Sequence, residues 1–367
     1  MSTTLSRAVR SARLSVLALL ARQLDDIEGA RHAADAAIAS LRAADQDVTT
    51  GLMDAAWLAA AQPGPPPSAD PDDPQPVLEL LAACCHPSLP EAARVALMLG
   101  VGAGLSTEEI SRAFAVSTET MGRRMAWSAH RVRPLLAEPV REATGTLPLE
   151  RILDVLALVF DDGIVHPHCR VDLPEEAVET TRTLIELLPA EQEPRALLAL
   201  MLLTRARRDA RQSDDGSLVP LEAQDRSLWH RSEIEEGLFL LRGSKRAGRN
   251  GPYQLRASIQ AIHVSAANAE DTDRDQLLAL HDQLMQVAPS DAVALGRAAA
   301  LASVHGPEAG LETVERLDLD SHLYHATRSH LLRLLGRHED AEHAWTAAVA
   351  RVRGAMEHAE LRRATGH

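Results

Sequence analysis

The sequence predicts an all-α fold, and three observations indicate it. Apolar residues recur every three or four positions along most segments, which is the spacing of one helix face. Aromatic residues make up only 2% of the 367 residues, so the core is expected to consist of Leu, Ala and Val. Runs of strand-favouring residues are scarce. Together these features favour helices that pack on helices.

Length, charge and cysteine usage set the broad class of the protein. A chain of 367 residues with 46% apolar residues has enough material for two or three domains. The formal net charge of −14 excludes a basic surface for nucleic acid over the whole chain. Three cysteines, two of them adjacent, do not make a disulfide framework. The apolar run at residues 15–21 is too short for a membrane span, so we expect a cytoplasmic protein without a membrane partner.

Residues 1–62 predict a small helical unit. Apolar side chains at helical spacing mark one buried face of its first helix. These side chains are Leu14, Leu17, Leu20, Leu24 and Ile27. Residues 30–41 predict a second helix, and residues 55–58 start a third. Residues 63–76 are rich in Pro and Asp and predict a semi-rigid, solvated linker.

Residues 77–140 predict a second helical unit that contains a helix-turn-helix. Residues 106–109 read Ser-Thr-Glu-Glu, which is a capping sequence for the start of one helix. A turn at 115–117 leads to a second helix from Thr118. The candidate DNA-binding residues on this helix are Thr118, Thr120, Arg123, Arg124, Trp127, His130, Arg131 and Arg133. Residues 84–140 carry six arginines and five acidic residues, so the attraction for phosphate is weak, and a purely structural helix-turn-helix is the alternative.

Residues 141–367 predict a series of helices with a repeat near its end. The segments Gly306–Gly310 and Arg337–Ala341 stand about thirty residues apart and share a turn followed by a helix start. Helix pairs of this kind stack into a curved array with a concave surface. The range 141–367 holds 26 basic and 36 acidic side chains. We therefore expect its surface to bind a protein or a small molecule.

A polar stretch between residues 214 and 263 predicts a buried network or a ligand pocket. Helix packing alone requires only periodic apolar residues, whereas this stretch reads Gln-Asp-Arg at 224–226 and Pro-Tyr-Gln at 252–254. Polar groups of this kind fix one packing arrangement or bind a ligand. The candidate residues are Asp161, Asp162, Arg207, Arg211, Gln224, Asp225, Arg226, Trp229, Tyr253, Gln254 and His263. We expect Asp225 to pair with Arg207 or Arg211, and the alternative is a charge-paired helix cover.

Two segments with cysteine and histidine raise the question of a metal. His166, His168 and Cys169 lie in a loop predicted from residue 161 onward, beside two carboxylates, and are candidate ligands for a transition metal. Plain surface side chains are the alternative. Cys84 and Cys85 are adjacent and do not suit one tetrahedral ion, so they predict buried thiols. No cofactor is expected. No nucleophile–base pair or phosphate loop names a reaction, so enzymatic activity stays open.

The residues of the polar stretch carry a resemblance to a known family. The chain resembles extracytoplasmic-function (ECF) sigma factors that have a tetratricopeptide-like C-terminal extension, over nearly all of its length from Pro74 onward. The matching residues are Arg207, Arg208, Arg211, Gly216, Leu221, Gln224, Asp225, Arg226, Trp229, Gly237, Gly251, Pro252, Tyr253 and Gln254. The resemblance implies a promoter-melting unit like sigma region 2 at 1–62 and a −35 reading unit like sigma region 4 at 77–140. It further implies a tetratricopeptide-like domain at 141–367, with promoter DNA and RNA polymerase as partners.

Two departures from the family pattern shape the functional expectation. The family continues its Trp-containing helix into a basic stretch that opens DNA, whereas here Trp57 and Leu58 lead into Ala59–Gln62 and a run of prolines. Trp127 and Ala129 stand where the family usually places Arg or Lys. We therefore expect a sigma-factor-like transcription regulator that binds DNA, senses a partner or ligand through its C-terminal domain and does not open promoters alone. The alternative is a repurposed scaffold that acts as a small-molecule-binding protein or enzyme, with a pocket in the C-terminal domain.

Overall fold

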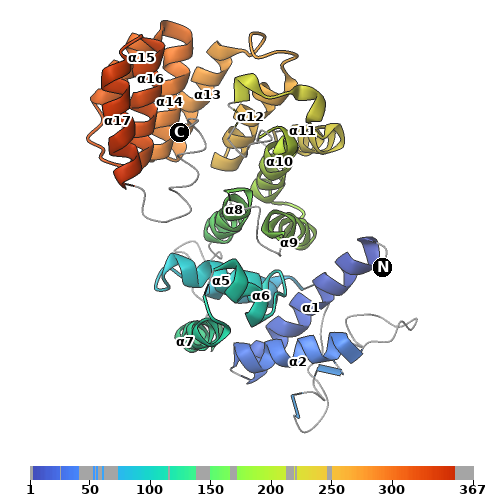
Figure 1. The fold of residues 1–367 in the computed structure, drawn as a ribbon. Coiled ribbons are helices and arrows are strands. Elements are labelled where there is room, and N and C mark those ends of the chain that lie inside the picture. The colour runs from blue at the N-terminus through green and yellow to red at the C-terminus, as the bar shows by residue number, and fades with distance from the viewer. Residues whose placement is uncertain are drawn as a thin grey trace. The chain divides into compact units, whose positions relative to one another are not determined.

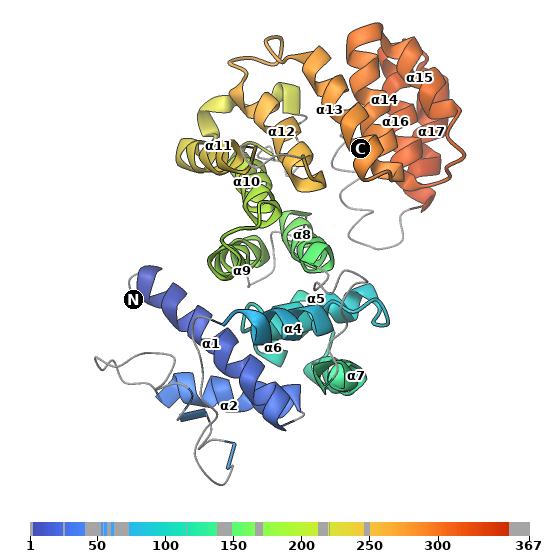
Figure 2. The same ribbon diagram turned by 180° about the vertical axis from the view of Figure 1, so that it is seen from behind.

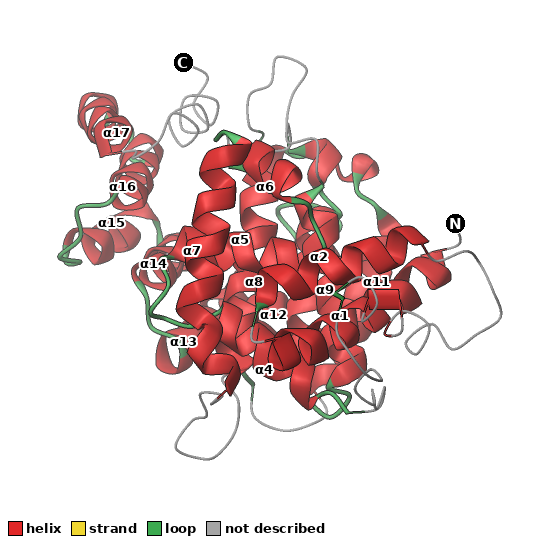
Figure 3. Cartoon of the chain, turned by 90° about the horizontal axis from the view of Figure 1, so that it is seen from below, coloured by secondary structure: helices red, strands yellow, loops and turns green. Residues whose placement is uncertain are grey.

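Helices make up the regular structure of the chain. The computed structural model describes residues 3–24, 26–40, 53, 55–56, 60–61, 73–114, 116–137, 149–165, 172–211, 219, 221–245 and 250–351. Within these ranges no strand occurs, as Figure 3 shows, and the all-α prediction is confirmed. Internal contacts divide the chain into two compact units, Met1–Pro194 and Arg195–His367. None of the helices in the described ranges has the length and apolar character needed to cross a membrane.

The first unit is built around the apolar face predicted for the first helix. Its helices are α1 (Thr3–Leu24), α2 (Ile27–Ser40), α4 (Gln75–Cys84), α5 (Glu91–Val101), α6 (Thr107–Ala113), α7 (Thr118–Ala137), α8 (Leu149–Val165) and α9 (Leu173–Leu187), shown in Figures 1 and 2. Leu14, Leu17, Leu20 and Ile27 are buried, and Leu24 at the end of α1 is half-buried. The four buried side chains confirm the predicted core face of this segment.

Adjacent thiols lie in the same core. Cys84 and Cys85 at the end of α4 are fully buried and free of any disulfide. Burial disfavours the charged thiolate and raises the pKa of the Cys84 thiol to about 12. The prediction of buried thiols is therefore confirmed.

Helices α8 and α9 extend the first unit beyond the boundary expected from the sequence. The sequence suggested that the C-terminal domain begins at residue 141, but α8 packs on α4 and α5, and α9 packs on α1. The division by contacts therefore falls after Pro194. The loop expected from residue 161 is also corrected, because α8 continues to Val165. Gly163 permits the start of α9 to lie close against this last part of α8, since a Cβ atom at that position would overlap the Pro174 ring.

Arg13 and Arg31, together with Asp35, join α1 and α2 to the helix-turn-helix segment; we call these three residues the arginine clasp. Arg13 is only 5% exposed. Its Nη1 donates to the carbonyl of Val101 at 2.8 Å and its Nη2 to that of Gly100 at 3.2 Å. These carbonyls belong to the last turn of α5, where backbone acceptors lack helical partners. A cation at a helix C-terminus also interacts favourably with the helix dipole.

Asp35 of α2 holds the same guanidinium group from its other side. Its Oδ1 accepts from Nε and Nη2 of Arg13 at 3.0 and 2.9 Å. Arg31, 2% exposed, donates to Thr107 Oγ1 at 3.0 Å at the start of α6 and pairs with Glu28 at 3.2 Å. The clasp thus gives two buried cations both a charge partner and backbone or hydroxyl acceptors, which is the condition for burying them.

The second unit is a succession of helices. It comprises α10 (Glu193–Arg205), the short 3-10 turns η1 (Arg208–Ala210), η2 (Leu221–Ala223) and η3 (Arg226–Leu228), and then α11 (Arg231–Lys245), α12 (Pro252–Ser265), α13 (Arg274–Val287), α14 (Asp291–His305), α15 (Pro307–Glu315), α16 (His322–Leu334) and α17 (His338–Arg351). From α11 onward each helix packs on the next one in the chain, and α14 also contacts α16. This order is visible from yellow to red in Figures 1 and 2.

Local sequence signals set the helix starts of the second unit. Asp273, Ser290 and Ser321 each accept a hydrogen bond from the backbone N–H three residues later and so cap α13, α14 and α16. The two segments of the predicted repeat both contain a helix start, at Pro307 and His338. The second of these helices is tied to its predecessor, since Ser329 Oγ donates to the carbonyl of Ala341 at 2.8 Å.

Replacement of Arg13 by Met is expected to destabilise the chain by about 2–4 kcal/mol, because it leaves buried carbonyls unpaired and Asp35 without its cation. Urea unfolding followed by circular dichroism measures the change. Arg22→Met on the same helix is the matched control. Arg22 is 61% exposed, and its ion pair with Glu79 is long, at 3.7 Å. It should change stability by less than about 0.5 kcal/mol. Equal stability of the two variants would contradict the role given to the clasp.

Candidate functional site

The helix-turn-helix segment is held together by hydroxyl groups at its turn. Ser106 caps α6 with a capping box: its side chain accepts from the Glu109 N–H, while Glu109 accepts from the Ser106 N–H at 2.8 Å. Ser111 Oγ lies 3.2 Å from Thr118 Oγ1, and Ser117 Oγ accepts from the Thr120 N–H at 3.1 Å. The predicted cap and the start of the second helix at Thr118 are therefore confirmed. Of the predicted turn, Ala115 lies outside the described residues.

Helix α7 presents one apolar and one basic face. Its buried positions include Met121, Met125, Ser128, Val132 and Leu136. Its exposed positions include six of the residues predicted to bind DNA: Arg123, Arg124, Trp127, His130, Arg131 and Arg133. The two threonines of that prediction, Thr118 and Thr120, have hydroxyls that take part in the turn instead of pointing only to solvent.

The charge of this surface is concentrated on α7 itself. The helix contains four arginines and a single acidic residue, Glu119. Within the described residues, no ion pair neutralises Arg123 or Arg124. The acidic side chains nearby are used elsewhere, because Glu108 pairs with Arg112 and Glu109 is part of the capping box. The face is therefore more basic than the charge of residues 84–140 suggested.

Trp127 and Ala129 occupy different environments on α7. The Trp127 side chain is 52% exposed at the middle of the basic face, whereas Ala129 is 7% exposed on the packed face. The sigma factors that the sequence resembles usually have Arg or Lys at both positions. Only Trp127 is in a position to present a side chain outward, so Ala129 is explained by packing.

The second candidate site is a polar cluster in the second unit, formed where η3 meets α12. Arg226 donates from Nη1 to the carbonyls of His263 at 2.9 Å and Ala266 at 2.8 Å, at the C-terminal end of α12. Its guanidinium lies 4.5 Å from the centre of the Trp229 ring, a cation–π distance. The Gln-Asp-Arg stretch therefore has a structural role, since it places Arg226 as a cap on α12.

Arg207 forms the deeper part of this cluster. It is 7% exposed, and its Nη2 donates to Gln260 Oε1 of α12 at 2.9 Å. Burial, followed by the nearby Arg211 and Arg226, lowers the pKa of the Arg207 guanidinium to about 10. Arg207 thus stays charged at neutral pH and holds α12 through a neutral amide.

His263 and His281 complete the cluster from α12 and α13. Burial lowers the pKa of the His263 imidazole below its usual 6.5, and the positive charges of Arg207 and Arg226 lower it further. Burial also lowers the pKa of the His281 imidazole. Gly296 leaves space for the His281 ring, because a Cβ atom there would lie 2.9 Å from Cε1. Both histidines are therefore held in the neutral form at pH 7.

The expected ion pair of Asp225 is not formed. Asp225 is exposed and instead caps η3, accepting from the Ser227 N–H at 2.8 Å. Hydrogen bonds from the Ser227 hydroxyl and then from its backbone N–H lower the pKa of the Asp225 carboxyl. A short side chain that can bond its own backbone two residues on does so at little entropic cost. Arg207, one of its two expected partners, binds Gln260.

Other predicted site residues have packing roles or belong to the first unit. Gln224 Nε2 donates to the carbonyl of Val219 at 3.1 Å, and Tyr253 and Gln254 are buried on α12. Asp161 is an exposed residue of α8, and the side chain of Asp162 lies outside the described residues. Arg211 is half-buried beside η1.

No metal site is found in the described part of the chain. His166, His168 and Cys169 lie outside that part. Among the side chains that are described, no three from His, Cys, Asp and Glu gather in a way that could hold an ion.

Two residues of the polar cluster, Gln260 and His281, were not predicted from the sequence. Gln260 follows Tyr253 and Arg256 at helical spacing, a signal that could have placed it on the same face.

Comparisons with known proteins find matches that include this region. A family model described as "Family of unknown function (DUF6596)" matches residues 148–245, which include Arg207, Arg226 and Trp229. The chain is also similar to an uncharacterized protein of Rhizobium meliloti (strain 1021). The two are 37% identical over 301 residues, which cover 79% of this chain and 71% of the relative. No solved structure matches the chain.

The neutral state of His263 predicts a loss of stability in acid. Its pKa is lower in the folded chain than the usual 6.5, so the unfolded chain takes up the proton first as the pH falls below 6.5. The stabilisation is present above that pH and decreases below it, by at most about 1.4 kcal/mol per pH unit for one group. In urea unfolding at pH 7.5 and 5.5, His263→Gln should lose less stability than the parent chain. His305→Gln, at an exposed position, should behave like the parent. If the parent chain, His263→Gln and His305→Gln all lost the same stability between pH 7.5 and 5.5, His263 would not be the group responsible.

Proposed function

We propose that this chain, which belongs to the same family as the uncharacterized protein of Rhizobium meliloti, is a sigma-factor-like transcription regulator. It binds DNA through α6 and α7 and senses a partner or ligand through its C-terminal helices. It does not open promoters alone. The observation that carries the proposal is the exposed basic face of α7, directly after a capped helix and a short turn.

The geometry of α7 suits insertion into a DNA groove. Met121, Met125 and Val132 anchor one side of the helix in the core, so the opposite side is presented on a rigid support. Arg123 and Arg124 lie near its N-terminal end, the part that reaches base edges in helix-turn-helix proteins. Arginine is the side chain that most often reads guanine in the major groove. Arg131 and Arg133, two turns later, are placed to contact phosphates.

The contacts of the arginine clasp support the proposal that the chain does not open promoters alone. The −10 and −35 elements are about 25 base pairs apart, which is about 85 Å along the duplex at roughly 3.4 Å per base pair. A protein that reads both must separate its region 2-like helices from its region 4-like helices. Here α1 and α2 contact α5 and α6 through hydrogen bonds of 2.8 to 3.2 Å. This contact therefore supports the proposal that the chain does not open promoters alone.

A second candidate function is that of a small-molecule-binding protein on a sigma-like scaffold. The observation that favours it is a cavity of about 410 Å³ in the second unit, within the size range of ligand sites. The acidic balance of residues 141–367 also favours a partner other than nucleic acid. Among the residues that line the cavity, no nucleophile is hydrogen-bonded to a base, so the cavity names no reaction.

DNA binding by α7 is tested with a triple variant, Arg123, Arg124 and Arg131 each to Ala. A gel-shift assay on DNA from the protein's own gene neighbourhood should show specific binding by the parent chain. One base-reading arginine contributes about 1–3 kcal/mol, so the triple variant should bind at least a hundredfold more weakly. The slope of log affinity against log salt should also become shallower, by about 0.9 for each phosphate that the variant no longer neutralises.

The control for this experiment removes the same charge from other helices. Arg22, Arg242 and Arg274 are exposed residues of α1, α11 and α13, and their triple Ala variant keeps α7 intact. It should bind DNA like the parent chain. If both triple variants bind equally, α7 is not the DNA-binding element and the proposal fails.

Run-off transcription tests the second half of the proposal. Core RNA polymerase, the purified chain and DNA from its gene neighbourhood are combined, with a functional sigma factor on its own promoter as positive control. We expect no specific transcript that depends on this chain, because the clasp keeps α1 and α2 beside the helix-turn-helix. A specific transcript would show that the chain opens promoters despite the clasp.

A further inference from the structure

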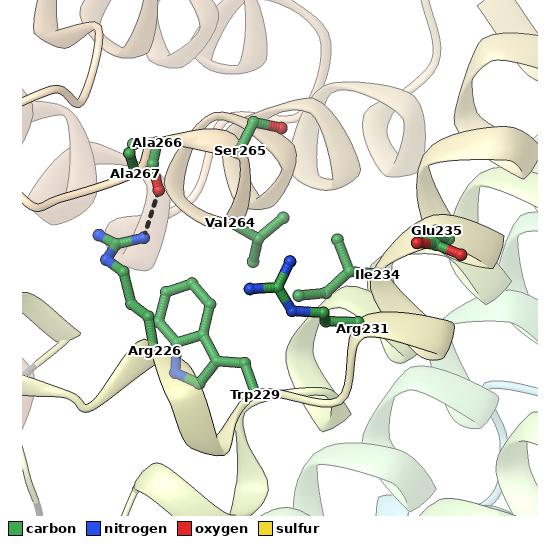
Figure 4. Close-up of a pocket in the computed structure, with 9 residues that line it drawn as sticks. All are labelled: Arg226, Trp229, Arg231, Ile234, Glu235, Val264, Ser265, Ala266 and Ala267. Atoms are coloured by element: carbon green, nitrogen blue, oxygen red, sulfur yellow. Dashed lines mark hydrogen bonds between the residues drawn. The ribbon is translucent and has the colours of Figure 1, made fainter.

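The cavity of the second unit lies between the start of α11 and the end of α12. It has a volume of about 410 Å³, and its lining includes Arg226, Trp229, Arg231, Ile234, Glu235 and Val264. Figure 4 shows these side chains around one space, with the Trp229 ring on one side and Val264 opposite. The site combines apolar walls with two guanidinium groups, which is the usual composition of a pocket for a small amphipathic ligand.

Arg226 is held rigidly at one end of the cavity. Its Nη1 is used by the carbonyls of His263 and Ala266, and its plane is supported by the Trp229 ring. A guanidinium has five N–H donors, so the Nη2 and Nε donors remain for a ligand. Because the side chain is already fixed in the absence of a ligand, binding would cost little conformational entropy.

Arg231 supplies a second cation from the first turn of α11. It is exposed, and within the described residues it has no ion-pair partner. Glu235 lies one turn later, the spacing at which helical ion pairs form, yet no such pair is present. Figure 4 shows Arg231 extending toward Val264 instead, while Glu235 lies beyond Ile234. The guanidinium therefore points into the cavity with its charge unneutralised.

We propose that this cavity binds a small organic monocarboxylate with an apolar body. A carboxylate matches the planar donor edge of a guanidinium. The apolar body would contact Trp229, Ile234 and Val264. With two arginines and one glutamate, the site carries a net charge of +1, which suits a singly charged ligand better than a phosphate dianion. The inference deepens the proposed sensing role of the C-terminal helices and rests on it for its biological meaning.

Such a ligand would act on the same contacts that hold α12. The Arg226 side chain that would bind the carboxylate also caps the end of α12, and the carbonyl it binds is that of His263 in the polar cluster. Ligand binding and the packing of α12 on its neighbours are therefore linked through one side chain. This linkage gives the second unit a physical route by which a small molecule changes helix packing.

Isothermal titration calorimetry on the full chain, without DNA, tests the site with phenylacetate as the probe and phenylacetamide as its neutral isostere. We expect phenylacetate to bind with a dissociation constant of about 0.1–1 mM, the range for an efficient ligand of this size. Phenylacetamide should bind at least tenfold more weakly, because it lacks the charge that pairs with the arginines. Arg231→Gln should weaken phenylacetate binding by a similar factor.

Arg242→Gln is the matched control, since Arg242 is an exposed residue of the same helix outside the cavity lining. It should bind phenylacetate like the parent chain. Absence of binding, equal binding of acid and amide, or an unchanged affinity in Arg231→Gln would each overturn the proposal. Stronger binding of inorganic phosphate than of phenylacetate would overturn the carboxylate assignment. The titration needs no DNA, so its failure leaves the gel-shift result untouched, and a negative gel shift leaves the titration untouched.

Discussion

The first unit depends on the burial of two guanidinium groups. Removing an arginine from water is costly unless its charge and its N–H groups are satisfied. Arg13 and the two terminal nitrogens of Arg31 find acceptors only when α1 and α2 lie against the end of α5 and the start of α6, because the acceptors come from both sides. The pair α1 and α2 thus supplies donors for acceptors on the pair α5 and α6. The basic face of α7 is presented by a body that exists only when all of these helices are together.

An analogous arrangement in the second unit joins a structural and a chemical role in one residue. The Nη1 group of Arg226 caps α12, and the face of the guanidinium lies over the Trp229 ring. The same side chain also lines the cavity. The sequence left a buried network and a ligand pocket as alternatives for this stretch. The structure contains a buried network, and a cavity lies directly beside it. The two descriptions concern neighbouring parts of one group of side chains and do not exclude each other.

The features that followed from the sequence were those set by neighbours along the chain. The helical fold, the capping box at Ser106, the start of α7 at Thr118 and the buried face of α1 all depend on residues within a few positions. The clasp did not follow, because Arg13 and the carbonyl of Val101 are 88 residues apart. An arginine at that spacing is indistinguishable from a solvated surface residue. Asp225 was assigned a distant cation, but a bond to its own turn competes successfully. The domain boundary was expected at residue 141, where the predicted helix-turn-helix unit ends, whereas α8 packs on α5 and the contacts divide the chain after Pro194.

The stacked order of α11 to α17 has a consequence for how the second unit opens. Each of these helices packs chiefly on its neighbours in the chain, so the stability of the array is largely a sum of interfaces between adjacent helices. The buried side chains of α14 to α17 form one shared cluster within it. An array of this kind opens in groups of helices that share a core. Amide hydrogen exchange should therefore be similar across α14 to α17, which share one cluster, and slower in α12, where the polar cluster adds buried hydrogen bonds. Contacts between near neighbours also close short loops, so this part of the chain should fold quickly once synthesised.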